Sequence, residues 1–188
     1  MYQTWDELES ACLACRKCGL CEGRTHVVFG AGKRDAKVMF VGEGPGEQED
    51  LQGKPFVGRS GQLLDKMLDA VDLSRESNIY IGNIVKCRPP KNRDPLPEEQ
   101  ALCMDWLRNQ FALLQPKIIV CLGRIAAMKM IRPDFHIMKE HGIFYDKNGV
   151  LMMATLHPAA LLRNPNNKPA AFEDFIRLHD KMDELGLL

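Results

Sequence analysis

The chain has 188 residues, 45% of them hydrophobic, and this length predicts a single domain over residues 1–188 with a sizeable core. Its 25 lysines and arginines balance 25 aspartates and glutamates, so the net charge is zero and excludes binding to nucleic acid or membrane through the overall charge of the protein. Such binding would need a local patch of charge. No apolar stretch is long enough to span a bilayer, and the polar start MYQTWDELES is unlike a signal peptide, so we expect a cytoplasmic protein without membrane contact.

The first element expected is a short helix that ends near a dense group of cysteines. Thr4 and Glu7 have the spacing of a capping box, which predicts a helix that runs toward Cys12. The stretch CLACRKCGLC, residues 12–21, then places four cysteines at a strict spacing of three. Seven cysteines is an odd number, and no export signal is seen, so metal or redox chemistry is favoured over a disulfide framework.

The cysteine spacing leaves two metal-binding schemes open. The ligands are either the four local cysteines, or two of them together with Cys87 and Cys103. Cys121 lies in an apolar run and is expected to be an ordinary core residue.

Three apolar runs, residues 37–41, 79–85 and 117–123, predict strands buried on both faces of a parallel sheet. A helix capped by Ser60 is expected between the first two runs, with its apolar face at the following positions: Leu63, Leu64, Met67, Leu68 and Val71. A second helix is expected between the other two runs. Its first turn holds Pro97, Glu98 and Glu99, and its apolar side holds Leu102, Trp106 and Leu113.

The C-terminal third predicts three further elements. Residues 124–131 read as a short helix, and two apolar runs around DKNG predict a hairpin that turns at Asn148 and Gly149. A last helix is expected over roughly residues 169–185. This alternation of strands and helices predicts the α/β class: a three-layer α/β/α sandwich with a mostly parallel central sheet.

The unusual motifs of the sequence follow the predicted strands. GEGPG, NIVKCRPP, LGR and TLHPAALLR each lie at or just after the end of a strand. In open α/β sheets the ligand binds outside the carboxyl ends of the strands. We therefore expect all four motifs to surround one cleft.

The first of these motifs, GEGPGEQED at residues 42–50, is not a phosphate loop. It lacks the patterns of a Walker A or dinucleotide-binding loop, and its four carboxylates would repel phosphate. Its glycines suit a pocket in which the backbone approaches a flat ligand, while Glu43 orients water or stabilises positive charge. The plain alternative is an acidic surface turn.

Three more side chains are candidates for ligand contact. Phe56, among glycines and polar residues, could offer its ring to a planar base, or it could simply fill the core. Asn83, at a strand end, has an amide that both donates to and accepts from a base edge, although it also suits a turn. His157, fixed before a proline, could donate a hydrogen bond to an anionic leaving group, or it could be structural.

Cations gather in the loop that follows the second strand. NIVKCRPPKNRDP carries four of them within eight residues, at Lys86, Arg88, Lys91 and Arg93. A loop of this kind could hold a nucleic-acid backbone despite the neutral total charge, or it could be an ordinary solvated loop.

Taken together, these motifs resemble the family 4 uracil-DNA glycosylases, the iron–sulfur branch of the uracil-DNA glycosylase superfamily. The resemblance rests on CRKC, VGEGPGEQED, GKPFVGRSGQLL, NIVKCRPPKNRDPLPEEQALC, CLGRIAA and TLHPAALLRNPNNK, in that order, from about residue 15 onward. It implies an α/β/α sandwich, a [4Fe–4S] cluster and hydrolytic release of uracil from DNA. The implied partners are uracil-containing DNA, free uracil as product and a replication clamp, and we expect a monomer.

The resemblance also implies roles for individual residues. The cluster ligands it implies are Cys15, Cys18, Cys87 and Cys103. The uracil pocket it implies contains Gly42, Glu43, Gly44, Phe56, Asn83 and His157, with Glu43 and His157 catalytic. Cys12 and Cys21 are additional to this pattern, so a swap of ligands within CLACRKCGLC stays open. A noncatalytic iron–sulfur DNA-binding module associated with replication is the alternative function.

Overall fold

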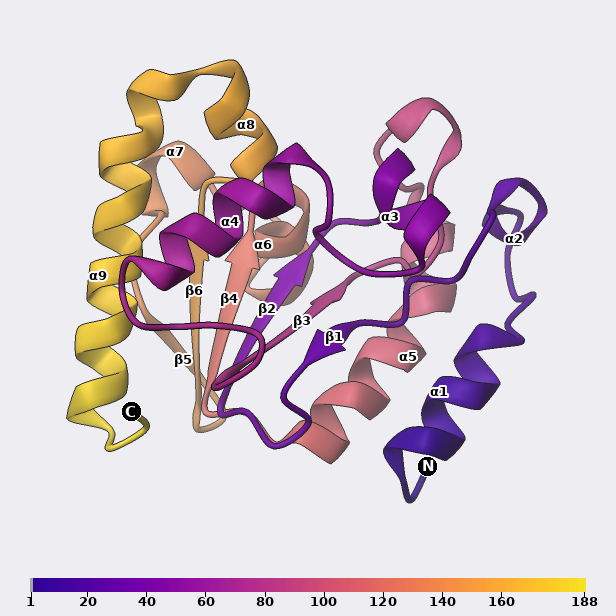
Figure 1. Ribbon diagram of the computed structural model, residues 1–188, viewed down its shortest axis with the longest axis horizontal. Helices are drawn as coiled ribbons and strands as arrows, with labels where there is room; N and C mark the ends of the chain where they lie inside the picture. Colours follow the sequence, from indigo (N-terminus) through magenta and orange to yellow (C-terminus); the bar gives the residue numbers. More distant parts are fainter. Residues whose placement is uncertain (1) are drawn as a thin grey trace.

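The computed structural model describes residues 2–188 and contains a six-stranded mixed sheet (Figure 1). The strand order is β1-β3-β2-β4-β6-β5, in which β3, β2, β4 and β6 run parallel and the edge strands β1 and β5 are antiparallel to their neighbours. The strands are β1 (Ala31–Gly32), β2 (Val38–Gly42), β3 (Ile79–Asn83), β4 (Ile118–Leu122), β5 (Tyr145–Lys147) and β6 (Val150–Thr155). The predicted, mostly parallel sheet is confirmed.

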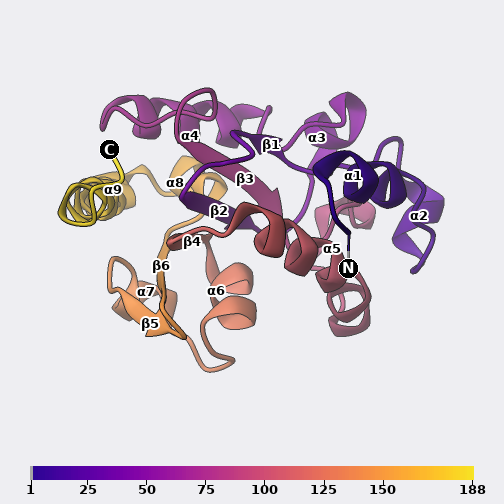
Figure 2. The same ribbon diagram turned by 90° about the horizontal axis from the view of Figure 1, so that it is seen from below.

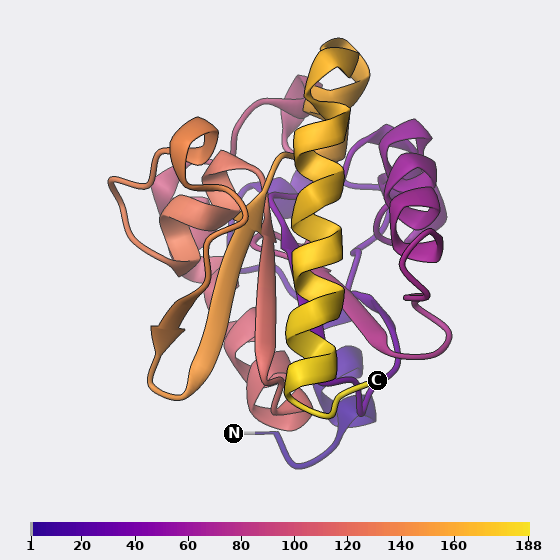
Figure 3. The same cartoon turned by 90° about the vertical axis from the view of Figure 1, so that its left-hand side faces the viewer.

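Helices cover both faces of this sheet and complete the predicted three layers (Figures 2 and 3). One face packs against α4 (Arg59–Asp69), α8 (Pro158–Arg163) and α9 (Lys168–Glu184), and the other packs against α1 (Trp5–Leu13), α5 (Pro97–Leu114) and α6 (Arg124–Met130). Three shorter α-helices are α2 (Leu20–Gly23), α3 (Glu47–Gln52) and α7 (Ile137–Glu140). Two 3₁₀ turns are η1 (Pro90–Asn92) and η2 (Pro165–Asn167).

The continuous apolar runs become strands because both of their faces are buried. In β2, Val38 and Phe40 join the cluster under α4 and α9, whereas Met39 and Val41 join the cluster under α1 and α5. Successive side chains of a strand point to opposite faces, so a strand between two helical layers must be apolar at every position. Every residue of β2, β3 and β4 is buried.

Local turn and cap signals of the sequence are largely confirmed. Thr4 caps α1 through a complete capping box with Glu7. The hairpin of β5 and β6 turns at Asn148 and Gly149, whose φ angles of 56° and 83° are the left-handed values that such a turn requires. The helix expected at 169–185 is α9, shifted by one residue.

Two sequence-based expectations are wrong, and one alternative is excluded. The residue that caps α4 is Gly58, and Ser60 already lies in the first helical turn, where its hydroxyl is not the cap. Leu102 is 44% exposed on α5, because the buried side of that helix follows Cys103, Trp106 and Leu107. The acidic stretch after Gly46 is a helix, α3, with two of its carboxylates buried, and not an exposed flexible turn. Among the described residues, no helix is long and apolar enough to cross a membrane.

Candidate functional site

A deep cleft lies at the carboxyl edge of the parallel strands, as the motif positions predict. It encloses about 580 Å³ and is bounded by the segments that follow β2, β3, β4 and β6. The residues that line it include five of the six that the sequence analysis assigned to the pocket: Glu43, Gly44, Phe56, Asn83 and His157. Segments that are far apart along the chain therefore meet at one place, because the parallel strands deliver them to the same edge.

The two glycines, Gly42 and Gly44, allow close packing at the end of the cleft. A Cβ atom at Gly42 would lie 2.4 Å from Asn83 Oδ1 and 2.7 Å from Phe56 Cζ. A Cβ atom at Gly44 would lie 2.7 Å from Val85 Cγ2. Gly42 thus sits behind the lining side chains, where only a residue without a side chain leaves room for Asn83 and Phe56 to share the end of the cleft.

Asn83 lines the cleft and carries an acceptor that has no hydrogen-bond partner in the described structure. The residue is only 1% exposed. Among residues 2–188, its Oδ1 is the one buried polar side-chain atom that has no hydrogen-bond partner. Leaving such a group unpaired costs about 1–3 kcal/mol, so its persistence points to a partner that arrives with a ligand. That partner must carry a hydrogen-bond donor.

Glu43 also lines the cleft and carries a partly buried carboxyl. Its pKa is raised to about 7, chiefly by burial and to a smaller extent by the nearby carboxylate of Asp94, while the Arg124 guanidinium opposes both effects. Asp94 and Arg124 themselves form an ion pair of 3.0 Å. A carboxyl that titrates near neutrality can accept a proton from water under ordinary conditions.

His157 is held as a neutral donor by the start of α8. It is the N-cap of that helix, and its Nδ1 accepts a hydrogen bond of 3.1 Å from the backbone N–H of Ala159. Burial lowers the pKa of the imidazole to about 4, with a smaller contribution from the cation of Arg163. Because Nδ1 is an acceptor, the proton of the neutral ring is on Nε2, which is left to donate. The rings of His157 and Phe56 lie 5.7 Å apart between centroids.

Glu49 is a site residue that the sequence reasoning missed. It lines the cleft, yet its carboxylate accepts hydrogen bonds from the backbone N–H groups of Gly46, Val57 and Gly58 at 2.8–3.2 Å. It therefore joins the two ends of the segment that carries Phe56. The only signal in the sequence was the position of a glutamate three residues after a glycine, as in a helix cap.

The basic loop differs from its expected role. Lys86 is buried with its ammonium on Gln110 Oε1 at 2.6 Å, and it cannot reach a phosphate. Arg93 forms a two-bond pair with Glu99, so much of its charge is already balanced. Lys91 is exposed at the tip of the loop and has no ion-pair partner among the described residues. Arg88 is partly exposed and makes a 3.6 Å pair with Glu47, so the predicted four-cation surface is reduced to Lys91 and Arg88.

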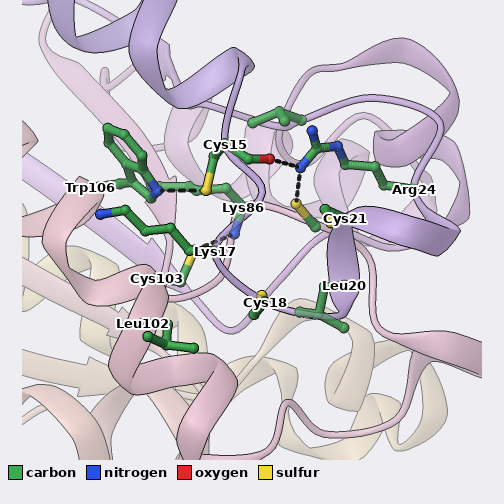
Figure 4. A pocket seen from close by; sticks show the side chains of 12 residues that line it. Cys15, Lys17, Cys18, Leu20, Cys21, Arg24, Lys86, Leu102, Cys103 and Trp106 are labelled. Atoms are coloured by element: carbon green, nitrogen blue, oxygen red, sulfur yellow. Dashed lines mark hydrogen bonds between the residues drawn. The ribbon is translucent and has the colours of Figure 1, made fainter.

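A second pocket, between the α1–α2 segment and α5, collects the cysteines (Figure 4). Its lining contains Cys15, Cys18, Cys21, Cys87 and Cys103. Cys12 is instead fully buried in the core and does not line this pocket. The lining therefore does not fit the scheme in which Cys12, Cys15, Cys18 and Cys21 are the four ligands. The choice that stays open is whether Cys21 takes the place of Cys15 or Cys18 beside Cys87 and Cys103. Cys121 is a fully buried core residue, as expected.

Hydrogen-bond donors surround the sulfur atoms of this pocket. Trp106 Nε1–H donates to Cys15 Sγ and Arg24 Nη1–H donates to Cys87 Sγ, both at 3.3 Å. The backbone N–H of Lys86 donates to Cys103 Sγ at 3.2 Å. These three contacts fit sulfur atoms that carry negative charge.

The chemistry of the cysteine pocket is that of a metal group bound through sulfur. Within residues 2–188, no three histidine, cysteine, aspartate or glutamate side chains are close enough to hold one metal ion. A tetrahedral zinc ion would draw its sulfur ligands to about 3.8 Å from one another. An iron–sulfur cluster keeps its cysteine ligands further apart, because the iron atoms lie between them. The sulfur-rich lining and the N–H donors therefore fit a cluster.

Comparisons with known proteins agree with this geometry. The sequence profile of the uracil DNA glycosylase superfamily matches residues 29–178. The chain is 41% identical over 184 residues to a type-4 uracil-DNA glycosylase of Archaeoglobus fulgidus, covering 94% of this chain and 92% of that protein. It is 46% identical over 156 residues to a type-4 uracil-DNA glycosylase of Thermotoga maritima, covering 82% and 81%.

A more distant similarity concerns a much larger protein. A DNA polymerase of Bacillus phage SP01 is 29% identical to the chain over 146 residues, which is 78% of this chain but 15% of the polymerase.

Proposed function

The chain belongs to the type-4 uracil-DNA glycosylases, and we propose that its cleft receives a deoxyuridine extruded from DNA and hydrolyses the N-glycosidic bond to release uracil. This makes it a hydrolase of DNA base-excision repair. The observation that carries the proposal is the unpaired, buried Oδ1 of Asn83 at the end of a cleft that also contains Glu43 and His157.

Recognition follows from what that acceptor requires. Uracil carries an N3–H donor on the pyrimidine edge, which would satisfy Asn83 Oδ1, while the amide group of Asn83 donates to the adjacent carbonyl oxygen O4. Cytosine has an acceptor at N3 and would leave two acceptors facing each other. The ring of Phe56 stacks on the bound base, and its restricted position at Gly42 keeps it available as a flat face.

The chemical step uses the two remaining side chains. As the bond between C1′ and N1 breaks, its electron pair passes to uracil, and His157 Nε2–H donates to the developing anion at O2. Glu43 faces the sugar, where positive charge develops, and accepts a proton from the water that attacks C1′. A neutral histidine keeps the donor without adding a full charge, and a carboxyl with a pKa near 7 is a suitable base.

Release of uracil from a labelled oligonucleotide tests the proposal directly. We expect the parent protein to excise uracil from U:G, U:A and single-stranded substrates, and His157→Ala and Glu43→Gln each to lose about a hundredfold or more in single-turnover rate. If both variants excise uracil at the parent rate, the roles are wrong. DNA binding without any release of uracil would favour the noncatalytic module.

For the cysteine pocket we propose a [4Fe–4S] cluster held by Cys15, Cys18, Cys87 and Cys103. The group would join the α1–α2 segment to the loop after β3 and to α5, so its main contribution would be to stability. Thiolate ligands require a reducing compartment, which supports the expected cytoplasmic location. The single domain over residues 1–188, the monomeric state and contact with a replication clamp stay predictions.

A further inference from the structure

The ring proposed to stack on uracil is attached to an unusual backbone. Phe56 has a φ angle of 52°, in the left-handed region that residues with a side chain rarely adopt. Such a conformation costs on the order of 1–2 kcal/mol and persists only where neighbouring groups impose it. The segment between α3 and α4 must therefore contain contacts that fix Phe56 in this state.

Arg75, nineteen positions further along the chain in the turn that leads into β3, supplies two of these contacts. Its Nη1 donates to the carbonyl of Pro55 at 2.5 Å and its Nη2 donates to the carbonyl of Phe56 at 2.6 Å. The two carbonyls flank Phe56. A helical type of conformation, of either hand, turns both carbonyls the same way, whereas an extended conformation turns them apart. The planar fork of one arginine therefore holds Phe56 in a helical type of conformation and excludes an extended one.

Gly61 supplies an independent constraint from the first turns of α4. A Cβ atom at this position would lie 1.9 Å from the carbonyl oxygen of Phe56 and 2.7 Å from its Cα. The backbone of Phe56 therefore rests directly on α4, and any larger residue at position 61 would push it away. The third nitrogen of the guanidinium, Nε, donates to Asp65 Oδ1 at 2.8 Å on the same helix.

We propose that Arg75 is a positioning residue for base recognition: it holds the two carbonyls around Phe56 so that the ring faces the cleft as a ready stacking surface. The proposal rests on the proposed function, because it assumes that the ring stacks on uracil. Arg75 is not among the residues that line the cleft and so acts only through Phe56. Its ion pair with Asp65 uses a different nitrogen of the guanidinium from those that bind the two carbonyls, and is not the source of the effect.

The experiment measures the affinity for free uracil, as inhibition of excision and by calorimetry, together with kcat and KM. We expect Arg75→Gln to weaken uracil binding and to raise KM by about tenfold, within the range that loss of base–aromatic stacking produces, with a smaller change in kcat. Arg75→Lys, which retains the charge but not the fork, should recover only part of the loss. Asp65→Asn is the matched control and should leave uracil affinity within about twofold of the parent.

A double-mutant cycle with Phe56→Leu separates positioning from general stability. If Arg75 acts through the ring, Arg75→Gln added to Phe56→Leu should weaken uracil binding by no more than about twofold further. Equal effects of Arg75→Gln in both backgrounds, or an equal loss in Asp65→Asn, would overturn the proposal. Gly61→Ala reaches the same backbone through another contact, and it should reproduce the loss if Arg75→Gln proves too unstable to measure.

Failure of the proposed function would look different. A parent protein that neither releases nor binds uracil would refute the function together with this role in base recognition. A parent protein that does both, with Arg75→Gln unchanged, would refute the positioning role alone. A crystal structure of Arg75→Gln with Phe56 still at its left-handed φ angle would also count against the role, whatever the activity.

Discussion

The chemistry proposed for the cleft depends on the protonation states of two side chains, and burial sets both of them. Burial disfavours a charged group, so it raises the pKa of the Glu43 carboxyl and lowers the pKa of the His157 imidazole. The base of the reaction thus titrates near neutrality, while the donor stays neutral at every pH where the base is ionised. Neither state requires a metal ion or an additional catalytic residue in the cleft.

The pH dependence of excision is the first prediction. Glu43 acts as a base only when ionised, so kcat/KM should fall about tenfold per pH unit on the acidic side of a midpoint near the pKa of about 7. His157, with a pKa of about 4, should contribute no second limb near neutrality. Single-turnover rates measured across this range, at constant ionic strength, give the midpoint.

Substitution of Asp94 tests the origin of that midpoint. The carboxylate of Asp94 raises the pKa of Glu43 and Arg124 lowers it, so Asp94→Asn should move the acidic limb to lower pH and Arg124→Gln should move it to higher pH. The direction of each shift, and not the maximal rate, is the diagnostic quantity, because both side chains also lie at the mouth of the cleft. A midpoint that is identical in all three proteins would show that another group controls the limb.

Several of these residues were within reach of the sequence, and others were not. Asn83 and His157 were recognisable because each is a polar side chain at the end of an apolar run, where strand geometry delivers it to the ligand edge. Arg75 and Glu49 were not recognisable, since their role is to bind backbone groups that are distant along the chain. Hydrogen bonds to a main-chain carbonyl or N–H leave no pattern of residue types.

At the scale of elements, α3 and the segment after it form one hydrogen-bonded unit around Glu49. The acidic composition of residues 47–50 suggested an exposed turn, but Asp50 accepts from the backbone of Thr25 and His26, and Glu49 accepts from three backbone N–H groups. A carboxylate that satisfies several N–H donors is stabilised when ionised and is therefore tolerated inside a fold. Composition alone does not distinguish this case from a solvated turn.

The stability of this unit is the second prediction. Glu49→Ala leaves three backbone N–H groups without their acceptor, so we expect a loss of about 2 kcal/mol in the free energy of unfolding. Glu47→Ala is the matched control on the same helix: its exposed side chain makes only a 3.6 Å pair with Arg88, and we expect a change within about 0.5 kcal/mol. Urea denaturation of both variants measures the difference. Equal losses would mean that the helix, and not the buried carboxylate, carries the stability.

The strands show why the fold was more predictable than the site. Burial on both faces forces an unbroken apolar run, so β2, β3 and β4 could be located from composition alone. The two-residue strand β1 and the four-residue helices α2 and α7 have no such pattern, because tertiary contacts and not local propensity stabilise elements of this length. The conformation of Phe56 is likewise set by tertiary contacts and has no pattern in the sequence.

At the scale of the whole molecule, the neutral net charge makes the few free cations near the cleft important for DNA binding. Lys91 at the tip of η1 is exposed, whereas Lys86 is buried and the partly exposed Arg93 is paired with Glu99. If Lys91 contacts one phosphate, Lys91→Ala should reduce the salt dependence of binding to single-stranded DNA by about 0.7 in the slope of log K against log salt concentration.

A lysine at the opposite edge of the sheet provides the comparison for this third prediction. Lys117 is exposed just before β4 begins, at the end of the strand remote from the cleft, and Lys117→Ala should leave the slope unchanged. Binding titrations over a range of salt concentrations, with a single-stranded oligonucleotide, measure both slopes. Equal slopes for the parent and both variants would exclude Lys91 from the interface.

The cysteine pocket links the N-terminal segment to the rest of the molecule, and its ligand set can be separated by substitution. Cys87 is buried in the loop after β3 and Cys103 lies on α5, whereas Cys15, Cys18 and Cys21 belong to the N-terminal segment. A cluster with one ligand removed is held less tightly, and the segments that it joins lose a covalent connection. The effect should therefore appear in colour and in stability together.

We expect Cys87→Ser to lose most of the visible absorbance of protein purified without air and to unfold at lower temperature. Cys21→Ser should retain both if Cys18 is the ligand, and the reverse result, loss in Cys21→Ser with retention in Cys18→Ser, would establish the swap. Cys121→Ser controls for the loss of a buried thiol outside the pocket, since it should lower stability without changing the absorbance per folded protein. Iron and sulfide analysis of each protein completes the measurement, and a colourless, fully stable parent would exclude the cluster.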